Sequence, residues 1–231
     1  HSTHGEWSIQ DVRAEVAAHS AIVPLAADGS FCVGTHAAVN LIADVSGTFP
    51  AGAGFTGFAP QRWVDSRETG TRLQAGGTLE LDVADLDLPA GIDTADVAAL
   101  ALTATAVDAA APGFLRVVAC DAESTTSNVN YTTSNPVPNL VVAAPGDDGR
   151  VCVYSHADTD VVVDAFGVFT ADAGLVDVSE RRFDSRAAGA PVRAGSVTVI
   201  DVSDLTGDDD TPVNGVVLNL TSVQAQGPGF F

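Results

Sequence analysis

Apolar and polar residues alternate along most of this chain with the two-residue period of half-buried β-strands. Residues 78–88 alternate leucine or valine with glutamate or aspartate, as a strand with one face on a core requires. The same alternation recurs in residues 96–107, 197–205 and 214–225, and β-branched residues dominate these runs. The best helical period lies in residues 9–22, where we expect only a short helical turn. About eight short strands in roughly 115 residues predict an all-β fold, as a β-sandwich or a small barrel.

The chain also repeats itself at an interval of close to 120 residues. The interval is 120 between Cys32 and Cys152, and 119 between Asp65 and Asp184. The matching segments keep a constant order: residues 27–33 with 147–153, 44–49 with 164–169, 62–67 with 181–186, and 112–115 with 228–231. Constant order with small, loop-sized drifts is the sequence signature of a repeat architecture.

The repeat frame divides the chain unevenly. We predict tandem β-sandwich or small barrel-like repeats of about 115–120 residues. Residues 1–50 are the second half of a unit, residues 55–170 a complete unit, and residues 171–231 the first half of a further unit. In the complete unit, alternation within the strands predicts a set of inward-facing residues. They are Val117, Leu140, Val142, Val151, Val153, Val161 and Val163.

Each half-unit on its own would expose an apolar face and unpaired strand edges, which promote aggregation. Three arrangements remove this liability. The halves close on each other within one chain, they pair head to tail between successive chains as a fibre, or each is completed by continuous chain outside this span. The expected partners are therefore other copies of the same repeat, in cis or in trans.

The net charge of the chain excludes some classes of binding partner. Thirty acidic residues against ten arginines and no lysine give a formal net charge of −20, with 46% hydrophobic residues. This excludes an electrostatic nucleic-acid partner, whose binding depends on cations, and disfavours an anionic membrane surface. The sequence contains no apolar stretch of the roughly 18 residues that a membrane helix needs, so we predict no membrane insertion.

Residues 112–169 carry a recognisable series of motifs. They read "PGFLRVVAC", "SNVNY", "PNLVV", "GRVCVY" and "DVVVDAFGVF", and Asp-Ser-Arg follows the equivalent of the last motif in both copies. This series resembles a β-repeat module of secreted and cell-surface actinobacterial proteins, whose pattern runs PGFLTVxPC, SNLNY, GxVCxY, DVxGYF and LLDTR. The segment from Trp7 to Ser20 departs from that pattern. The resemblance implies an exported, non-catalytic module.

The resemblance also places Cys120 and Cys152 in one module, which implies a disulfide between them. In an oxidising compartment, closing a loop of that length stabilises by roughly 3–4 kcal/mol. Cys32 is the copy of Cys152, and its partner is expected outside the given span. The alternative is three free thiols in a reducing cell.

The repeated Asp-Ser-Arg motif has two interpretations. Asp65 with Arg67, and Asp184 with Arg186, supply a carboxylate and a guanidinium that can clamp a substrate. The favoured interpretation is structural, because an Asp at a turn caps local N–H groups and an Arg pairs across the loop.

Acidic turns are the remaining candidate chemistry. Clustered carboxylates are what Ca²⁺ prefers, and Asp158 with Asp160 is a weak calcium candidate, as is the cluster in residues 208–210. The repeat copies are inconsistent here, and no complete calcium loop occurs, so solvated turns are the default interpretation. We expect no other cofactor or metal.

The expected function is therefore a non-catalytic structural or adhesive β-repeat of an exported, surface-associated or fibre-forming protein. No G-x-S-x-G, H-E-x-x-H or P-loop pattern occurs in the sequence, so we expect no enzyme. The alternative is an accessory module of a secreted hydrolase that binds polysaccharide or cell wall.

Overall fold

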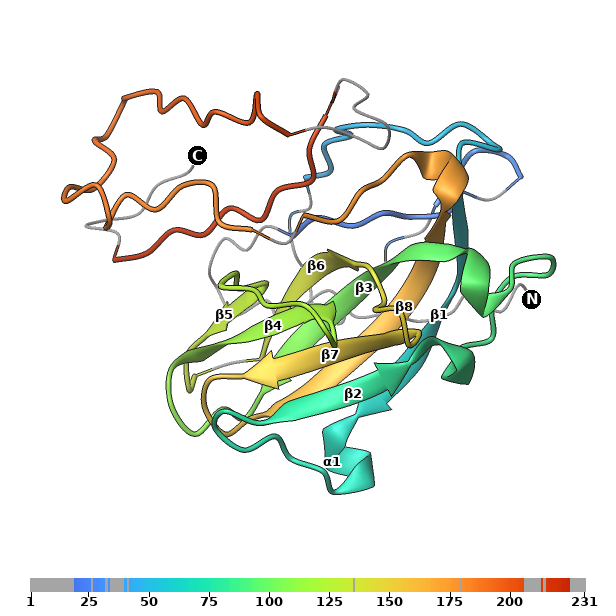
Figure 1. Cartoon of the computed structure of the whole chain (residues 1–231), viewed down its shortest axis with the longest axis horizontal. Coiled ribbons are helices and arrows are strands. Elements are labelled where there is room, and N and C mark those ends of the chain that lie inside the picture. The colour runs from blue at the N-terminus through green and yellow to red at the C-terminus, as the bar shows by residue number, and fades with distance from the viewer. Residues whose placement is uncertain are drawn as a thin grey trace.

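The computed structural model describes residues 19–25, 27–31, 33, 40, 42–134, 136–178, 180–205, 213 and 215–224 (Figure 1). Its strands are β1 (Phe55–Asp65), β2 (Thr78–Asp82), β3 (Val97–Val107), β4 (Gly113–Ala119), β5 (Val129–Tyr131), β6 (Val137–Ala143), β7 (Arg150–Ser155) and β8 (Asp160–Thr170). A single turn of helix, α1 (Ser66–Thr69), follows β1, and 3₁₀ turns occupy Val83–Asp85, Thr94–Asp96 and Ala171–Ala173. The predicted all-β class is confirmed.

The eight strands form two separate antiparallel sheets, which makes the fold a sandwich and not a barrel. One sheet has the order β1-β8-β3-β6 and the other β2-β7-β4-β5 (Figure 1). The first and last strands lie side by side, with Phe55 opposite Phe169. Both ends of the unit therefore leave the sandwich at the same place.

Strand pairing is fully interleaved between the two halves of the unit. Each of the six ladders joins one of the strands β1–β4 to one of the strands β5–β8. The isolated bridge between Leu73 and Thr159 also joins the two halves. Within this unit, neither half contains a pair of strands that bond to each other, so neither half can build a sheet without the other.

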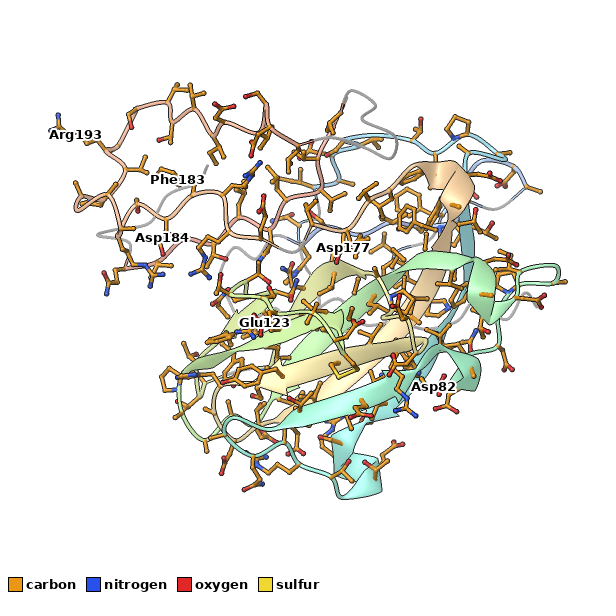
Figure 2. The ribbon with its side chains drawn as sticks, in the orientation of Figure 1. Asp82, Glu123, Asp177, Phe183, Asp184 and Arg193 are labelled. Carbon is orange, nitrogen blue, oxygen red and sulfur yellow. A yellow bond between two sulfur atoms is a disulfide. The ribbon has the colours of Figure 1, made fainter. Side chains whose placement is uncertain are left out.

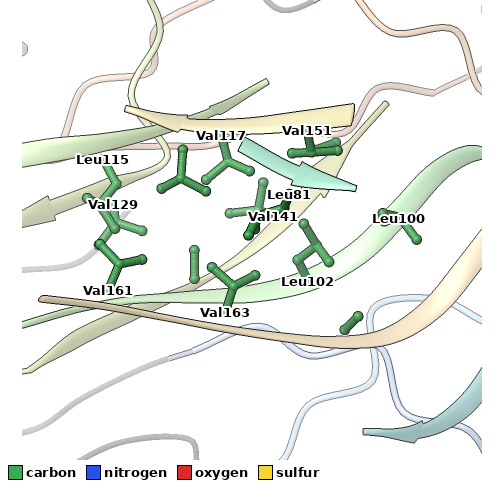
Figure 3. Packing of buried hydrophobic residues seen from close by; sticks show 14 of the residues in the cluster. Leu81, Leu100, Leu102, Leu115, Val117, Val129, Val141, Val151, Val161 and Val163 are labelled. Carbon is green, nitrogen blue, oxygen red and sulfur yellow. The ribbon is translucent and has the colours of Figure 1, made fainter. Parts of the chain in front are cut away.

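The inner faces of both sheets pack into one hydrophobic core (Figure 3). Every strand except β1 contributes a buried side chain to it, and β1 packs Phe58, Trp63 and Val64 against its edge. The predicted inward-facing residues Val117, Val151, Val153, Val161 and Val163 all belong to this cluster. At about 1.5–3 kcal/mol per fully buried Val or Leu, this core is the main stabilising term of the unit.

The prediction was wrong for two residues of β6. Val141 and Ala143 face the core, whereas Leu140 and Val142 pack on the opposite side of the sheet. The run from Leu140 to Ala143 is apolar at every position, so alternation could not fix its phase.

The outer face of the β1-β8-β3-β6 sheet is apolar as well. A second cluster there contains Ala99, Ala101, Phe166 and Phe169, with Leu140 and Val142 beside it. Parts of the flanking chain cover it: Ile22 and Leu175 pack on this cluster, and the Phe49 ring lies 4.8 Å from that of Phe55. These contacts explain why nearly every residue of β8 is buried.

The flanks themselves contain no strand among their described residues, which run in extended segments over one side of the sandwich (Figure 1). Beyond the packing of Leu175, scattered polar contacts join the C-terminal flank to the sandwich, such as Asn219 Nδ2 donating to the carbonyl of Ser127 at 2.6 Å. The predicted division into half-units at residues 1–50 and 171–231 stays a prediction. Cys32 and residues 9–18, 208–210 and 228–231 lie outside the described residues.

Candidate functional site

The first Asp-Ser-Arg motif lies at the end of β1, where it starts α1. Asp65 has an extended backbone and caps the helix, accepting from the backbone N–H of Arg67 at 3.1 Å. Its carboxylate also accepts from Arg67 Nε at 2.8 Å and from Arg62 Nη1 at 3.1 Å. Only 4% of Asp65 is exposed. The motif thus puts a buried carboxylate between two guanidinium groups.

These contacts keep Asp65 ionised. The side-chain hydrogen bond from Arg67 lowers the pKa of Asp65 below its usual range, against the opposing effect of burial. The same hydrogen bond raises the pKa of Arg67. A carboxylate held in this way is a poor general base, because its proton affinity has been lowered.

Ser66 connects the motif to β8. It is fully buried, its Oγ donates to Asp160 Oδ1 at 2.7 Å, and the same oxygen accepts from the backbone N–H of Val161 at 2.9 Å. Asp160 also pairs with Arg72. A buried hydroxyl with both a donor and an acceptor role filled has no access to a substrate, so this arrangement serves packing.

The structure therefore brings Asp160, a separate calcium candidate in the sequence, next to the Asp65–Arg67 motif through Ser66. Arg62 completes the charged cluster by donating from Nε to Asp164 on β8 at 2.5 Å. The sequence offered a signal for this pair, since Arg62 and Asp164 both lie in the repeated segments. The cluster joins β1, α1 and β8 by alternating charges.

The second copy of the motif has the same local geometry in a different setting. Asp184 accepts from the backbone N–H of Arg186 at 3.0 Å and from its Nε at 2.9 Å. The side-chain hydrogen bond from Arg186 lowers the pKa of Asp184 to about 2. Figure 2 shows Asp184 on the C-terminal flank, away from the sheets, so the two motifs do not form one site.

The carboxylates proposed as calcium ligands, those of Asp158 and Asp160, already accept hydrogen bonds from groups of the protein. Asp158 Oδ1 accepts from the backbone N–H of Ala75 at 2.6 Å, and Asp160 accepts from Ser66 and Arg72. A cation beside Asp160 would meet the Arg72 guanidinium, which repels it. No group of three or more His, Cys, Asp or Glu residues placed to hold a metal occurs in the part of the chain that the structure describes. Calcium binding stays a hypothesis, and these contacts argue against it.

The predicted disulfide is confirmed. Cys120, just after β4, bonds to Cys152 on β7 with their Cα atoms 4.7 Å apart, and the neighbouring residues Val118 and Cys152 are register partners. The bond lies across the outer face of the β2-β7-β4-β5 sheet. Persistent disulfides of this kind are a feature of oxidising compartments.

The same outer face carries an aromatic group that the sequence analysis missed. Phe114 stacks on His156 with ring centroids 5.1 Å apart and planes at 16°. Arg116 lies over the Tyr154 ring at 5.0 Å. All four side chains occupy alternate, outward positions of β4 and of β7 with its following turn. Their spacing of two residues in each segment was the signal that could have revealed this platform.

An open hollow borders the platform at Arg116. It encloses about 590 Å³ and is lined by Arg116, Ala122, Glu123, Ser124, Thr125 and Glu180. Glu123 lies on the loop that faces the C-terminal flank (Figure 2). The site therefore combines half-buried rings with polar groups, and sugars, which have apolar and hydroxyl faces, bind to such combinations.

Comparison with protein-family models, with curated proteins and with solved structures gave no match to this chain. None of the described helices is long and apolar enough to cross a bilayer.

Proposed function

We propose that this chain is a structural β-repeat of an exported, surface-associated protein. The observation that carries the proposal is how the chemistry-bearing side chains of residues 55–170 are used. Asp65, Ser66, Asp160 and Asp164 are buried, and each is bonded to a partner that ties one strand or turn to another. A cluster in which every reactive group has a structural partner contributes stability.

The disulfide and the charge support the same role. The bond from Cys120 to Cys152 fastens β4 to β7, which suits a module that must persist outside the cell. A net charge of −20 keeps neighbouring copies apart through self-repulsion and opposes non-specific association. Disulfide-bonded, acidic repeat units linked in series would form a stiff and soluble spacer.

A scattering experiment tests the structural role. A polypeptide with two copies of the 231 residues in series, and one with three copies, are compared with the single chain by small-angle X-ray scattering. A constant increase in maximum dimension per copy is the expected result, because each repeat contacts mainly its neighbours. A maximum dimension that does not grow from two copies to three would contradict a spacer role.

The aromatic platform favours a second candidate, an accessory module that binds polysaccharide. Phe114 and Tyr154 lie half-buried on this face with ring centroids 5.8 Å apart, beside Arg116. Titration of solubilised cell-wall polysaccharide into the chain tests this candidate, with Tyr154→Ala as the site variant and Thr78→Ala as the control. Thr78 is the register partner of Tyr154 and carries no ring. Binding that Tyr154→Ala abolishes and Thr78→Ala retains would establish the second candidate, and absence of binding would remove it.

A further inference from the structure

We propose that the two flanks of this chain fold together into a second sandwich, by interleaving their strands in the order seen in the complete unit. The inference rests on the repeat that also underlies the proposed structural role. It specifies the partner of each flank, namely the other flank of the same chain.

The topology makes each flank dependent on a partner. The C-terminal flank carries the copies of β1, β2 and β3, and the N-terminal flank carries those of β7 and β8. In the complete unit, β1 and β3 both pair with β8, and β2 pairs with β7. No two strands of β1–β4 pair with each other there. A flank alone therefore has no partner for its strands, and we expect those strands to form only where the two flanks pair with each other.

The flanks retain the core residues of a sandwich. Leu218 and Leu220 are 53% and 56% exposed, whereas their copies in β3, Leu100 and Leu102, are fully buried. Val33 is 55% exposed, whereas its copy Val153 is fully buried. Ile42 and Val45 are also exposed, at positions that β8 buries. Apolar side chains in this number on both flanks call for burial against another surface.

Local structure in the flanks already matches the complete unit at three turns. In each turn an aspartate accepts from the backbone N–H two residues ahead. In the flanks these bonds join Asp28 with Ser30, Asp184 with Arg186, and Asp201 with Ser203. Their counterparts in the complete unit join, in the same order, Asp148 with Arg150, Asp65 with Arg67, and Asp82 with Ala84. The turns are set by local sequence, whereas the strands depend on pairing with the other flank.

The exits from the complete unit place the two flanks beside each other. The backbone N–H of Thr170 donates to the carbonyl of Gly54 at 2.7 Å. Gly54 has a φ of +73°, and a Cβ there would overlap the backbone of Ala173. In a second sandwich Phe49 must lie opposite Gly174, as Phe169 lies opposite Phe55. Both residues are only a few positions from these adjacent exits.

This proximity favours closure within the chain over pairing with a second copy. Short linkers give an effective concentration in the millimolar range, far above a micromolar concentration of free chain. The charges of the two flanks also match those of paired strands. Arg181 and Asp44 are the copies of Arg62 and Asp164, which form an ion pair across β1 and β8.

Engineered cysteines test the proposal in the full chain. Val64 and Val163 are register partners of β1 and β8, and their copies are Phe183 and Ala43. Ala43→Cys with Phe183→Cys, in a Cys32→Ser background, is expected to oxidise to a cross-linked monomer, because register partners lie within disulfide range. Ala43→Cys with Val197→Cys is the matched control. Val197 copies Thr78 of the other sheet, so this pair should cross-link at least about tenfold less.

The cross-linking results distinguish pairing of the flanks within one chain, pairing between two chains, and no strand interleaving at all. A cross-linked monomer for the register pair alone supports closure within the chain. Disulfide-linked dimers and larger species overturn it and assign the partner to a second copy. Equal cross-linking of both pairs, or none in either, overturns interleaving altogether. Each of these results is independent of the scattering and polysaccharide experiments, so failure here leaves the proposed structural role separately testable.

Discussion

Arg62 Nε donates to Asp164 Oδ1 at 2.5 Å, and this ion pair fastens the first strand of the sandwich to the last. Asp164 is 7% exposed, so its charge depends on this partner for compensation. The pair lies towards the far end of the β1–β8 ladder from Phe55 and Phe169, where both flanks depart, so it fastens these two strands at the end that the flanks do not reach.

Arg62→Ala should destabilise the complete unit by about 1–3 kcal/mol, because it leaves a nearly buried carboxylate without its guanidinium. Urea unfolding of the full chain measures the change. Arg150→Ala is the control: Arg150 pairs with Glu80, which is largely exposed, and its loss should cost less than about 1 kcal/mol. Equal effects of the two variants would show that the β1–β8 pair has no special role.

The Asp65 carboxylate should make the stability depend on acid pH. Its pKa is lowered in the folded state by the hydrogen bond from Arg67. The resulting stabilisation is complete above the usual aspartate value of 3.8 and is lost as the pH falls through the lowered pKa. The difference in unfolding free energy between the wild type and Asp65→Asn should therefore be constant near neutral pH and shrink below pH 3.8. Asparagine still caps the helix, so a difference that does not change with pH would refute the role of the charge.

Reduction of the disulfide should lower the stability of the sandwich. The bond closes a separation of 32 residues, for which the chain-entropy relation gives roughly 3–4 kcal/mol. Thermal unfolding with and without reductant measures the loss, and Cys152→Ala should reproduce it. Cys32→Ser is the control and should leave the reductant-sensitive step intact. A wild-type transition that reductant does not shift would be inconsistent with a stabilising bond.

The phase of β6 can be tested by paired substitutions. Val141 is 2% exposed in the core, whereas Val142 lies half-buried on the outer face of its sheet. Val141→Asp should prevent folding, because an unpaired buried charge costs several kcal/mol. Val142→Asp should leave a folded unit with reduced stability. Circular dichroism of both variants shows which substitution disrupts the fold more. A larger loss of structure in Val142→Asp than in Val141→Asp would contradict the observed register.

Much of the fold follows from local sequence. Alternation located β3 almost to the residue, and the apolar runs located β4, β7 and β8. It located the start of β2 but not its end, because Asp82 caps a 3₁₀ turn that interrupts the alternating run of residues 78–88. The sequence could not show which residues of β6 face the core. Both faces of its sheet are apolar, and alternation disappears where both sides of a strand are buried.

The candidate site was less predictable. The repeat singled out Asp65 and Arg67, but the link from Ser66 to Asp160 spans 94 positions and depends on the pairing of β1 with β8. The platform of Phe114, Arg116 and Tyr154 likewise depends on β4 lying beside β7. Such contacts are set by strand order, which a single sequence does not specify.

Hydrogen exchange on the unmodified chain tests the central claim most directly, namely that the flanks pair strand by strand. At micromolar concentration, with a light-scattering mass of one 23.4 kDa chain, amides in residues 42–48, 176–183 and 216–222 should be protected as their copies in β8, β1 and β3 are. That protection should fall in Leu218→Asp with Leu220→Asp, while residues 55–170 keep theirs. Rapid exchange throughout both flanks of the wild-type monomer, beside a protected complete unit, would contradict the account.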